Sequence, residues 1–450
     1  MSDTPQAIYD ARTLGMEKKL ILGLQHMFAM FGATVLVPVI TGLSMSATLL
    51  FAGIGTLVFH LCTKMRVPAF LGSSFAFLGG YAAVVSLGAQ QGLTAQEALP
   101  YACIGVFSAG IIYFILAGLF AAYGPKRVMR FFPPIVTGPI IIAIGLTLSG
   151  SAISNCQQNW WIALLAMLII IGCNIWGRGM IRIIPILLGV LGSYLVAACF
   201  GICDFSPVKE AAWLGLPFHW SDTAFSVFQN PKWGLIISAV IAILPISLAT
   251  MMEHIGDMCA ISSTTGRNYL EDPGLHRTLI GDGLATMLAS LFGAPANTTY
   301  GENTGVLNLT RVYDPRVIRY AAVFAILLSF CPKFSAVISC MPPATIGGVS
   351  LMLYGMISAV GVRNVVENQV DFTKSRNVII AAMILVLSIG IKYGANDQVN
   401  LGFTSLSGLA VAAIVGVLLN AVLPGKDYEF GANPKGDKAV DFEINPSLRK

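Results

Sequence analysis

The chain has 450 residues, of which 56% are hydrophobic and only 11% are charged. Soluble domains carry about 25% charged residues, so this composition excludes a soluble globule and indicates a protein whose solvent is lipid. The net charge is +5, and no basic stripe with interleaved aromatic residues indicates a nucleic-acid partner.

Long apolar runs recur along the whole chain, and each is compared with the roughly 20 residues that a helix needs to cross a bilayer. We count fourteen such runs between the charged clusters. They centre near Phe31, Leu57, Phe77, Ile112, Ile142, Leu168, Leu191, Ile241, Thr286, Val306, Ala325, Leu353, Leu385 and Ala413. The runs around Phe77 and Val306 are the weakest. The sequence therefore predicts an all-α polytopic membrane protein with fourteen transmembrane spans.

The positions of Lys and Arg predict the orientation of these spans, because basic residues near span ends stay on the cytoplasmic side. With the N-terminus inside, only four of the 27 basic residues fall in outer loops: Lys209, Lys232, Lys333 and Lys392. We therefore expect a multi-pass protein of the cell (inner) membrane with both termini cytoplasmic and its basic loops facing anionic membrane lipid. The polar, partly acidic start does not resemble a signal peptide, so we expect the first span to be retained.

The nine cysteines and five histidines are scattered along the chain without the spacings of disulfide frameworks or zinc sites. No phosphate-binding loop, nucleophile motif or other cofactor motif is present in the sequence. We therefore expect no metal and no cofactor, and a transporter rather than a membrane enzyme.

Two pairs of similar segments indicate that the chain is duplicated. Pro133–Gly138 resembles Pro342–Gly347, and Pro68–Ser74 resembles Pro295–Gly301, the second pair lying in the weak spans. Seven spans per half make the second copy enter the membrane from the opposite side, which is the inverted-repeat plan of many secondary transporters. The repeats would occupy residues 1–227 and 228–450.

The two weak spans, the third and the tenth, contain the strongest helix-breaking signals. Pro68 and Pro295 lack an N–H and bias the residue before them toward extended geometry. We expect extended segments at 69–74 and 296–300 to interrupt these spans, and short helices to follow from about Phe75 and Gly301. The N-termini of those helices would aim N–H donors at a site in the membrane. Ordinary kinked spans are the alternative.

Carboxylates within apolar spans are costly unless they face a cavity or a partner, so each is a candidate functional residue. Glu253 and Asp257 are four residues apart and share one helix face. Glu302 would lie in the first turn after the second interruption. The alternative for the first pair is that the span ends before them and both lie in a solvated loop. Asp282 reads as structural, and for His254 a packing role stays open beside a functional one.

Four motifs together resemble the nucleobase–cation symporter-2 (nucleobase–ascorbate transporter) family, and within it the bacterial members that carry uracil. These motifs are Gln25–Pro38, Gly72–Phe77, Glu253–Asp257 and Asn297–Asn303, and the resemblance covers about residues 18–424. It implies two inverted seven-span repeats divided into a core and a gate, and a homodimer formed through the gate. The implied core is approximately residues 18–124 plus 233–338, and the gate approximately 126–203 plus 340–424.

The resemblance also implies the residues of a substrate site. Glu253 and Glu302 match the substrate-binding glutamates, and Phe75 matches an aromatic residue that packs on the substrate ring. The other implied pocket residues are Ala33, Ser74, Tyr300, Gly301 and Asn303. A uracil-like ring suits this set, since carboxylates accept from its N–H groups, helix N–H groups donate to its carbonyls, and Phe75 stacks on its face.

Energy coupling is expected to use protons, which would enter through Asp257 and Glu253. Two carboxylates on one helix face disfavour simultaneous ionisation. Uracil permeases of this type can carry His where Asp257 stands, so a purely orienting role for Asp257 stays open. The sequence thus predicts a secondary active transporter that imports uracil by proton symport. The alternatives are a xanthine, purine or other nucleobase symporter of the same family, and an anion transporter of the same fold.

Overall fold

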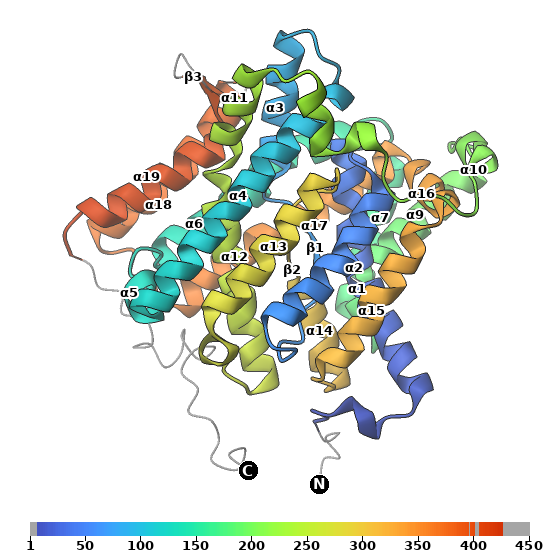
Figure 1. Ribbon diagram of the computed structural model, residues 1–450, viewed down its shortest axis with the longest axis horizontal. Helices are drawn as coiled ribbons and strands as arrows, with labels where there is room; N and C mark the ends of the chain where they lie inside the picture. The colour runs from blue at the N-terminus through green and yellow to red at the C-terminus, as the bar shows by residue number, and fades with distance from the viewer. Residues whose placement is uncertain (1–6, 396, 401–404, 426–450) are drawn as a thin grey trace.

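Helices of very different lengths form most of the computed structural model, which describes residues 7–395, 397–400 and 405–425 (Figure 1). The first half of the chain forms η1 (Ala11–Thr13), α1 (Met16–Thr41), α2 (Met45–Cys62), β1 (Leu71–Ser73), α3 (Leu78–Gln90), α4 (Ala95–Tyr123), α5 (Pro125–Met129), α6 (Pro134–Cys156), α7 (Trp160–Trp176), α8 (Met180–Ile183), α9 (Pro185–Cys199), α10 (Ser206–Glu210), η2 (Trp220–Asp222) and η3 (Ala224–Gln229).

The second half continues with another series of helices and three further short strands. These are α11 (Trp233–Ile243), α12 (Ile246–Thr265), η4 (Leu270–Gly274), α13 (Leu275–Leu291), β2 (Asn297–Thr299), α14 (Gly301–Thr310), α15 (Pro315–Ser329), α16 (Pro332–Ser339), α17 (Pro343–Glu367), α18 (Ser375–Gly394), β3 (Val399–Asn400), β4 (Ser405–Leu406) and α19 (Gly408–Val422).

The helix ends follow from local sequence signals. Pro134 and Pro343 occupy the first turns of α6 and α17, where the missing N–H would have no helical partner in any case. Thr94 and Glu97 cap the start of α4 reciprocally, each side chain accepting from the other's backbone N–H. Gly42 ends α1 in the left-handed conformation that glycine adopts without strain.

The long apolar helices identify a multi-pass membrane protein. In the described part of the chain, seven helices are long and apolar enough to cross a membrane when α11 and α12 count as one, Trp233–Thr265. An eighth span is obtained if α15 and α16, bent by 87°, also count as one. Helices α7, α9 and α19 are apolar but shorter. The two interrupted elements are shorter still, with 13 residues in α3 and 10 in α14. The count of fourteen spans therefore stays a prediction.

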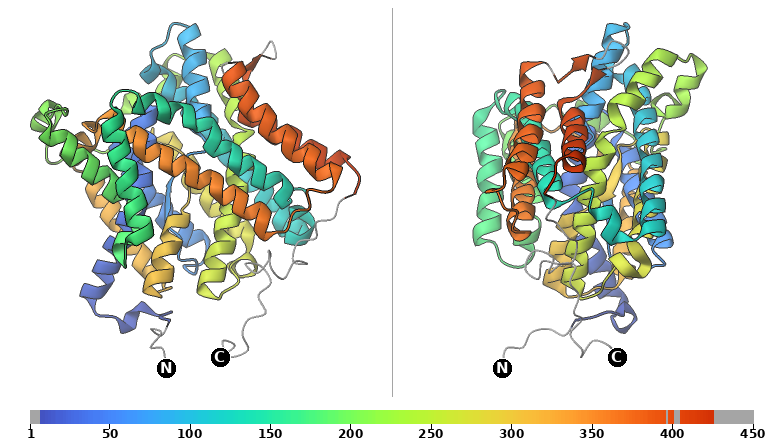
Figure 2. Two further views of the ribbon diagram at one scale, coloured as in Figure 1. Left: turned by 180° about the vertical axis from the view of Figure 1, so that it is seen from behind. Right: turned by 90° about the vertical axis from the view of Figure 1, so that its left-hand side faces the viewer.

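The helices pack in two sets that are mixed along the sequence. In one set α13 lies between α2 and α4, and α15 packs on α1 and α2. In the other, α17 lies along α6 and α7, and α18 packs on α6 and α19, as the view from behind shows (Figure 2). Helix α12 contacts both sets, because it packs on α4 and α13 as well as on α6 and α19.

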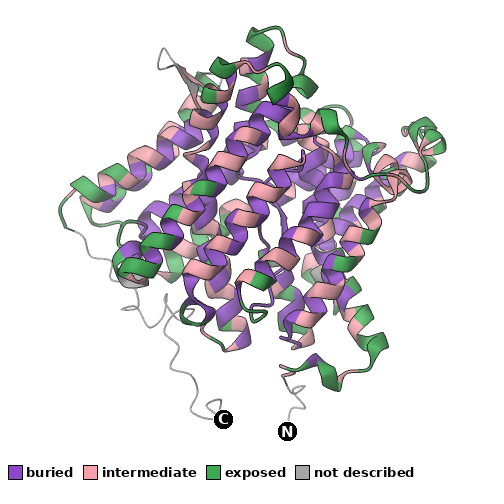
Figure 3. Ribbon diagram, in the orientation of Figure 1, coloured by how far each residue is buried: buried purple, intermediate pink, exposed green. Residues whose placement is uncertain are grey.

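Residues on the inside of this bundle are buried, while many large apolar side chains are exposed on its outside (Figure 3). Exposed examples include Trp161 (82%), Val386 (67%) and Leu168 (63%). Such an outer surface would be unfavourable in water and matches contact with lipid.

Candidate functional site

Two extended segments from opposite halves of the chain cross near the middle of the bundle. Strands β1 and β2 pair antiparallel, with Gly72 opposite Thr298 and Ser73 opposite Asn297. The pairing continues at both ends, since the N–H of Ser74 donates to Ala296 O at 2.8 Å and that of Tyr300 to Phe70 O at 3.1 Å. The extended geometry expected after Pro68 and Pro295 is thus confirmed, and each segment supplies the hydrogen-bond partners of the other.

Side chains of the surrounding helices satisfy the outer edges of this small sheet. The hydroxyl of Thr56 accepts from the N–H of Leu71 at 2.9 Å, and that of Thr286 donates to Asn297 O at 2.6 Å. Asn297 in turn donates to Phe51 O at 2.7 Å. Every residue of both strands is buried. Non-helical backbone deep in a membrane protein persists where it lines a water-filled cavity or where protein groups satisfy it, as they do here.

Short helices leave the two strands, as expected. Helix α14 begins at Gly301, at the residue predicted, whereas α3 begins at Leu78 rather than near Phe75. The difference arises because residues 75–77 form a turn, closed by the N–H of Leu78 donating to Phe75 O at 3.1 Å. Glu302 lies in the first turn of α14, and its side chain is outside the part of the structure that is described.

The carboxylates Glu253 and Asp257 belong to α12, which continues to Thr265. The alternative that both lie in a loop is therefore wrong. Asp257 faces the start of α14: a Cβ placed on Gly301 would lie 3.2 Å from its Oδ1, and the hydroxyl of Thr299 donates to its Oδ2 at 3.0 Å. The structure thus brings one predicted carboxylate to the N-terminus of the interrupted helix.

A buried acid–histidine pair lies directly behind this contact. Nδ1 of His254 is 3.2 Å from the hydroxyl of Thr299 and 3.5 Å from Oδ2 of Asp282, and both His254 and Asp282 have no exposed surface. Thr299 therefore links Asp257 to this pair. Sequence reasoning missed Thr299; it predicted a structural role for Asp282 and left open whether His254 is only a packing residue. The sequence signal for this pair was Asp282 itself, a carboxylate between Gly281 and Gly283 in an apolar run.

Four residues of the predicted site, Phe75, Tyr300, Ala33 and Ser74, are nearly closed off from solvent, whereas Gly301 is exposed. Phe75 is 7% exposed and meets Tyr354 of α17 edge-on, with ring centroids 6.1 Å apart. The hydroxyl of Tyr300 donates to Ser73 O at 2.7 Å. Ala33 of α1 and Ser74 are buried, and the Ser74 hydroxyl has no hydrogen-bond partner among the described residues. No motif in the sequence indicated that Tyr354 would lie against Phe75.

Asn303 connects α14 to α1. Its amide nitrogen lies 3.3 Å from His26 O and 3.4 Å from His26 Nδ1. Its Oδ1 is buried without a partner in the described structure. The structure therefore groups Tyr300, Gly301 and Asp257 at the strand crossing, and it places the amide of Asn303 against α1.

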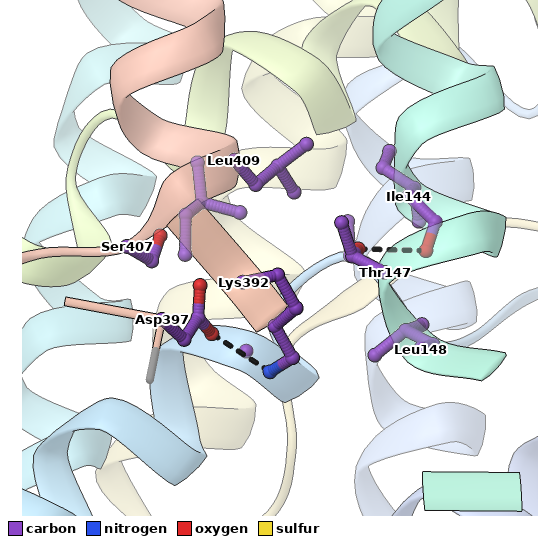
Figure 4. Close-up of a pocket in the computed structure, with 10 residues that line it drawn as sticks. Ile144, Thr147, Leu148, Lys392, Asp397, Ser407 and Leu409 are labelled. Carbon is purple, nitrogen blue, oxygen red and sulfur yellow. Dashed lines mark hydrogen bonds and ion pairs between the residues drawn. The ribbon is translucent and has the colours of Figure 1, made fainter. Parts of the chain in front are cut away.

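A small cavity lies beside this group rather than within it (Figure 4). Its walls come from α3, α6, α12, α18, α19 and the segments next to them. The lining residues are Ala76, Gly79, Ile144, Thr147, Leu148, Ile246, Lys392, Asp397, Ser407 and Leu409. Lys392 and Asp397 form an ion pair of 2.8 Å in its wall. None of the predicted substrate-binding residues lines it, although Ala76 directly follows Phe75, so this cavity adjoins the candidate site and is distinct from it.

The described residues contain no cluster of three or more His, Cys, Asp or Glu side chains suited to a metal ion. At the start of α14 the structure instead places the carboxylate of Asp257 beside Gly301, so a hydrogen-bond acceptor lies next to helix-terminal N–H donors.

Comparison with known proteins connects this arrangement with a family. The model of the xanthine/uracil "Permease family" matches residues 17–396. The uracil permease of Bacillus caldolyticus is 41% identical over 93% of this chain and 94% of its own length. The uracil permease of Escherichia coli K12 is 37% identical, with 89% of this chain and 90% of its own length covered.

Solved structures share the fold at much lower identity. The transmembrane domain of the cyanobacterial bicarbonate transporter BicA matches with a TM-score of 0.58 and 14% identity, covering 92% of this chain and all of that domain. The structure of SLC26A9 matches with a TM-score of 0.64 and 12% identity, covering 92% of this chain and 66% of that one. The match to a bicarbonate transporter agrees with the expectation that this fold occurs in anion transporters.

The family model and the relatives both cover most of the chain, including both strands and α12 and α14. They confirm the resemblance seen in the motifs, and because permeases are transporters they confirm that the chain is not an enzyme. The chain belongs to the xanthine/uracil permease family of membrane transporters.

Proposed function

We propose that this permease imports uracil by proton symport across the cytoplasmic membrane. The observation that carries the proposal is the set of relatives named uracil permease, among them those of B. caldolyticus and B. subtilis, both 41% identical to this chain. These relatives support transport of a nucleobase in general. Uracil as the substrate, protons as the coupling ion and the inward direction are the specific parts of the proposal.

The chemistry of the strand crossing supports a uracil-like substrate. Such a ring carries N–H donors beside C=O acceptors in one plane. Glu253 and Glu302 would accept from the ring N–H groups, while the N–H groups at the start of α14 would donate to a carbonyl. Stacking on Phe75 would add about 1 to 3 kcal/mol, as aromatic side chains do with nucleobases elsewhere.

The remaining proposed contacts lie around the same crossing. Ser74, Tyr300 and Gly301 would line the pocket with Ala33, and Asn303 would hold α14 against α1 beside it. Ala33 and Ser74 are buried whereas Gly301 is exposed, so substrate would reach the start of α14 directly and the two buried residues only when neighbouring helices move. Loss of either glutamate should reduce affinity at least tenfold, because hydrogen bonds to charged groups are worth about 1.5 to 3 kcal/mol.

Movement would occur between a core and a gate. The proposed core contains α1–α4 and α11–α15, and the proposed gate contains α6, α7, α9 and α17–α19. Helix α17 packs most extensively on α6, and α13 on α4. Each of these pairs lies within one of the two sets, which supports the division. Seven spans per half, an inverted repeat, and dimers that associate through the gate complete the proposal.

Reconstituted protein tests the substrate. Purified full-length chain in liposomes should accumulate labelled uracil when the outside is more acidic, with and without sodium. Unlabelled uracil should compete better than xanthine, and bicarbonate should not compete. A preference for xanthine would favour the purine alternative, and uptake of bicarbonate without uracil uptake would contradict the proposal. Accumulation that requires sodium would reject proton coupling.

A further inference from the structure

We propose that residues 7–14, which precede α1, act as a strap that positions the two helices carrying the predicted carboxylates, with Tyr9 as its main positioning residue. The inference rests on the proposed function, because it assigns α12 and α14 to the substrate site. The strap lies at the end of the bundle where α14 ends and α15 begins (Figure 1).

The strap is paired through its backbone with the segment that follows α14. The N–H of Ile8 donates to Arg311 O, and the N–H of Tyr313 donates to Ile8 O, both at 2.8 Å. These bonds make a parallel bridge between Ile8 and Val312. Arg311 is the left-handed residue that ends α14, so the strap holds the chain directly at the exit of that helix.

The side chain of Tyr9 joins this segment to α12. Its hydroxyl donates to the carbonyl of Thr265, the last residue of α12, at 2.7 Å. Its ring lies 5.3 Å from the ring of Tyr313, centroid to centroid, and the guanidinium carbon of Arg267 lies 4.5 Å from its centroid. One half-buried side chain thus contacts the end of α12, the residues that follow it and the residues that follow α14.

A buried carboxylate anchors the other end of the strap. Asp314, 6% exposed, accepts from the N–H of Ala11 at 2.6 Å through Oδ2 and from the N–H of Arg316 at 2.9 Å through Oδ1. Arg316 also pairs with Asp10 at 2.7 Å. The backbone N–H of Arg12 donates to Asp10 and, with the charges of Arg12 and Arg316, holds the pKa of Asp10 below its ordinary value, which keeps this carboxyl group ionised at neutral pH.

Apolar packing closes the strap over the start of α15. Ala11 has no exposed surface and lies in a small cluster with Val312 and Val317, against which Ile8 and Leu14 pack. Backbone pairing, a buried carboxylate and apolar contacts therefore act over the same few residues. A terminal segment with so many partners is ordered rather than frayed.

The consequence for the site follows from which helices the strap joins. Glu253 and Asp257 lie on α12, and the N–H groups proposed to bind substrate lie at the start of α14. Helix α14 is short, so a restraint at its C-terminal end fixes the direction of its N-terminal end. Without the strap, α12 and α14 would rotate or slide relative to each other. Substrate affinity would then fall although every group that touches the substrate is still present.

The test uses full-length purified protein carrying Tyr9→Ala or Tyr9→Phe. The matched control is Tyr123→Ala, since Tyr123 is 58% exposed at the end of α4. Tyr9→Ala should speed amide hydrogen exchange at the end of α12 and along α14 in ligand-free protein, and leave α17 unchanged. It should also raise the calorimetric Kd for uracil on the order of threefold to tenfold, the range expected for one lost hydrogen bond.

Tyr9→Phe keeps the ring contacts and loses only the hydroxyl, so it should give a smaller change of the same kind, and it serves if Tyr9→Ala does not fold. Tyr123→Ala should match the wild type in both measurements. Faster exchange with an unchanged Kd, or unchanged exchange in α12 and α14, would overturn the positioning role. If the wild-type protein itself does not bind uracil, the proposed function fails, and the exchange measurement alone then decides whether the strap restrains the two helices.

Discussion

Gly72 shows how closely single residues are fitted at the strand crossing. A Cβ at this position would lie 2.6 Å from the Thr34 hydroxyl oxygen and 2.6 Å from Cε2 of Tyr300. The ring of Tyr300 cannot swing away freely, because its hydroxyl donates to Ser73 O at 2.7 Å. The glycine is therefore required by the close approach of α1 and of Tyr300, the residue that follows β2.

We predict that Gly72→Ala lowers both thermal stability and uracil affinity. Overpacking of a close-packed interior costs about 1 to 3 kcal/mol. Gly118→Ala on α4 is the control, since no heavy atom lies within 4 Å of its Cβ position and alanine is favoured over glycine in a helix by about 1 kcal/mol. Thermal unfolding and calorimetry in the same detergent measure both effects. A Gly72→Ala protein as stable as wild type would contradict this prediction, because it would show that the strand crossing accommodates the added methyl group.

Two roles are open for Asp257, which accepts a hydrogen bond from Thr299: it either carries the coupled proton or only orients its neighbours. If Asp257 carries the proton, Asp257→Asn should retain exchange of external for internal uracil and lose accumulation driven by an inward proton gradient. The reason is that an amide still accepts from Thr299 but cannot be ionised and reprotonated. Counterflow and gradient-driven uptake in liposomes separate the two. A variant that still concentrates uracil in response to pH alone would mean that Asp257 only orients its neighbours.

At the scale of elements, the connection between α18 and α19 depends on one partly buried carboxylate. Asp397 pairs with Lys392 of α18 through Oδ2 and accepts from the N–H of Gly408, the first residue of α19, at 2.9 Å through Oδ1. The side chains of Lys392 and Asp397 are 25% and 16% exposed, so water screens the pair poorly.

We predict that Lys392→Met destabilises the protein by about 1.5 to 3 kcal/mol, the range for a hydrogen bond to a charged group. Asp397→Asn should cost a similar amount, and the double variant should cost less than the sum, because each change removes the same interaction. Glu367→Gln is the control: its pair with Arg363 is 3.5 Å long and well exposed, so it should contribute only a few tenths of a kcal/mol. Denaturation of purified protein measures these differences, and strictly additive effects would contradict the coupling.

At the scale of the whole molecule, the distribution of basic residues makes the topology testable. We predict that a cysteine placed in the tail after Lys426 reacts with a membrane-impermeant maleimide only after cells are opened, because the tail is expected to be cytoplasmic. A cysteine replacing Lys209, which is expected outside, should react in sealed cells. Each background needs the nine native cysteines removed or shown to be silent. Labelling of the tail in sealed cells would reject the orientation.

Much of the architecture follows from the sequence alone. Apolar runs and their flanking prolines determine where the long helices start, and helix breakers at Pro68 and Pro295 are strong enough to predict both extended segments. The four motifs are specific enough to identify the family from their residues and spacing. These features are local, since they depend on hydrophobic length, missing N–H groups and backbone restrictions that each segment carries by itself.

Tertiary structure alone decides which of these local features meet. The register of β1 with β2, the bridge from Asp257 through Thr299 to the His254–Asp282 pair, and the hold of Tyr9 on the end of α12 join residues tens to hundreds of positions apart. Asp282 could be predicted only as a structural residue, because its partner becomes apparent once α12 and α13 pack. Buried polar groups must pair with one another because they have lost their contacts with water. Which groups pair depends on how the helices pack, and the periodicity of the sequence does not predict it.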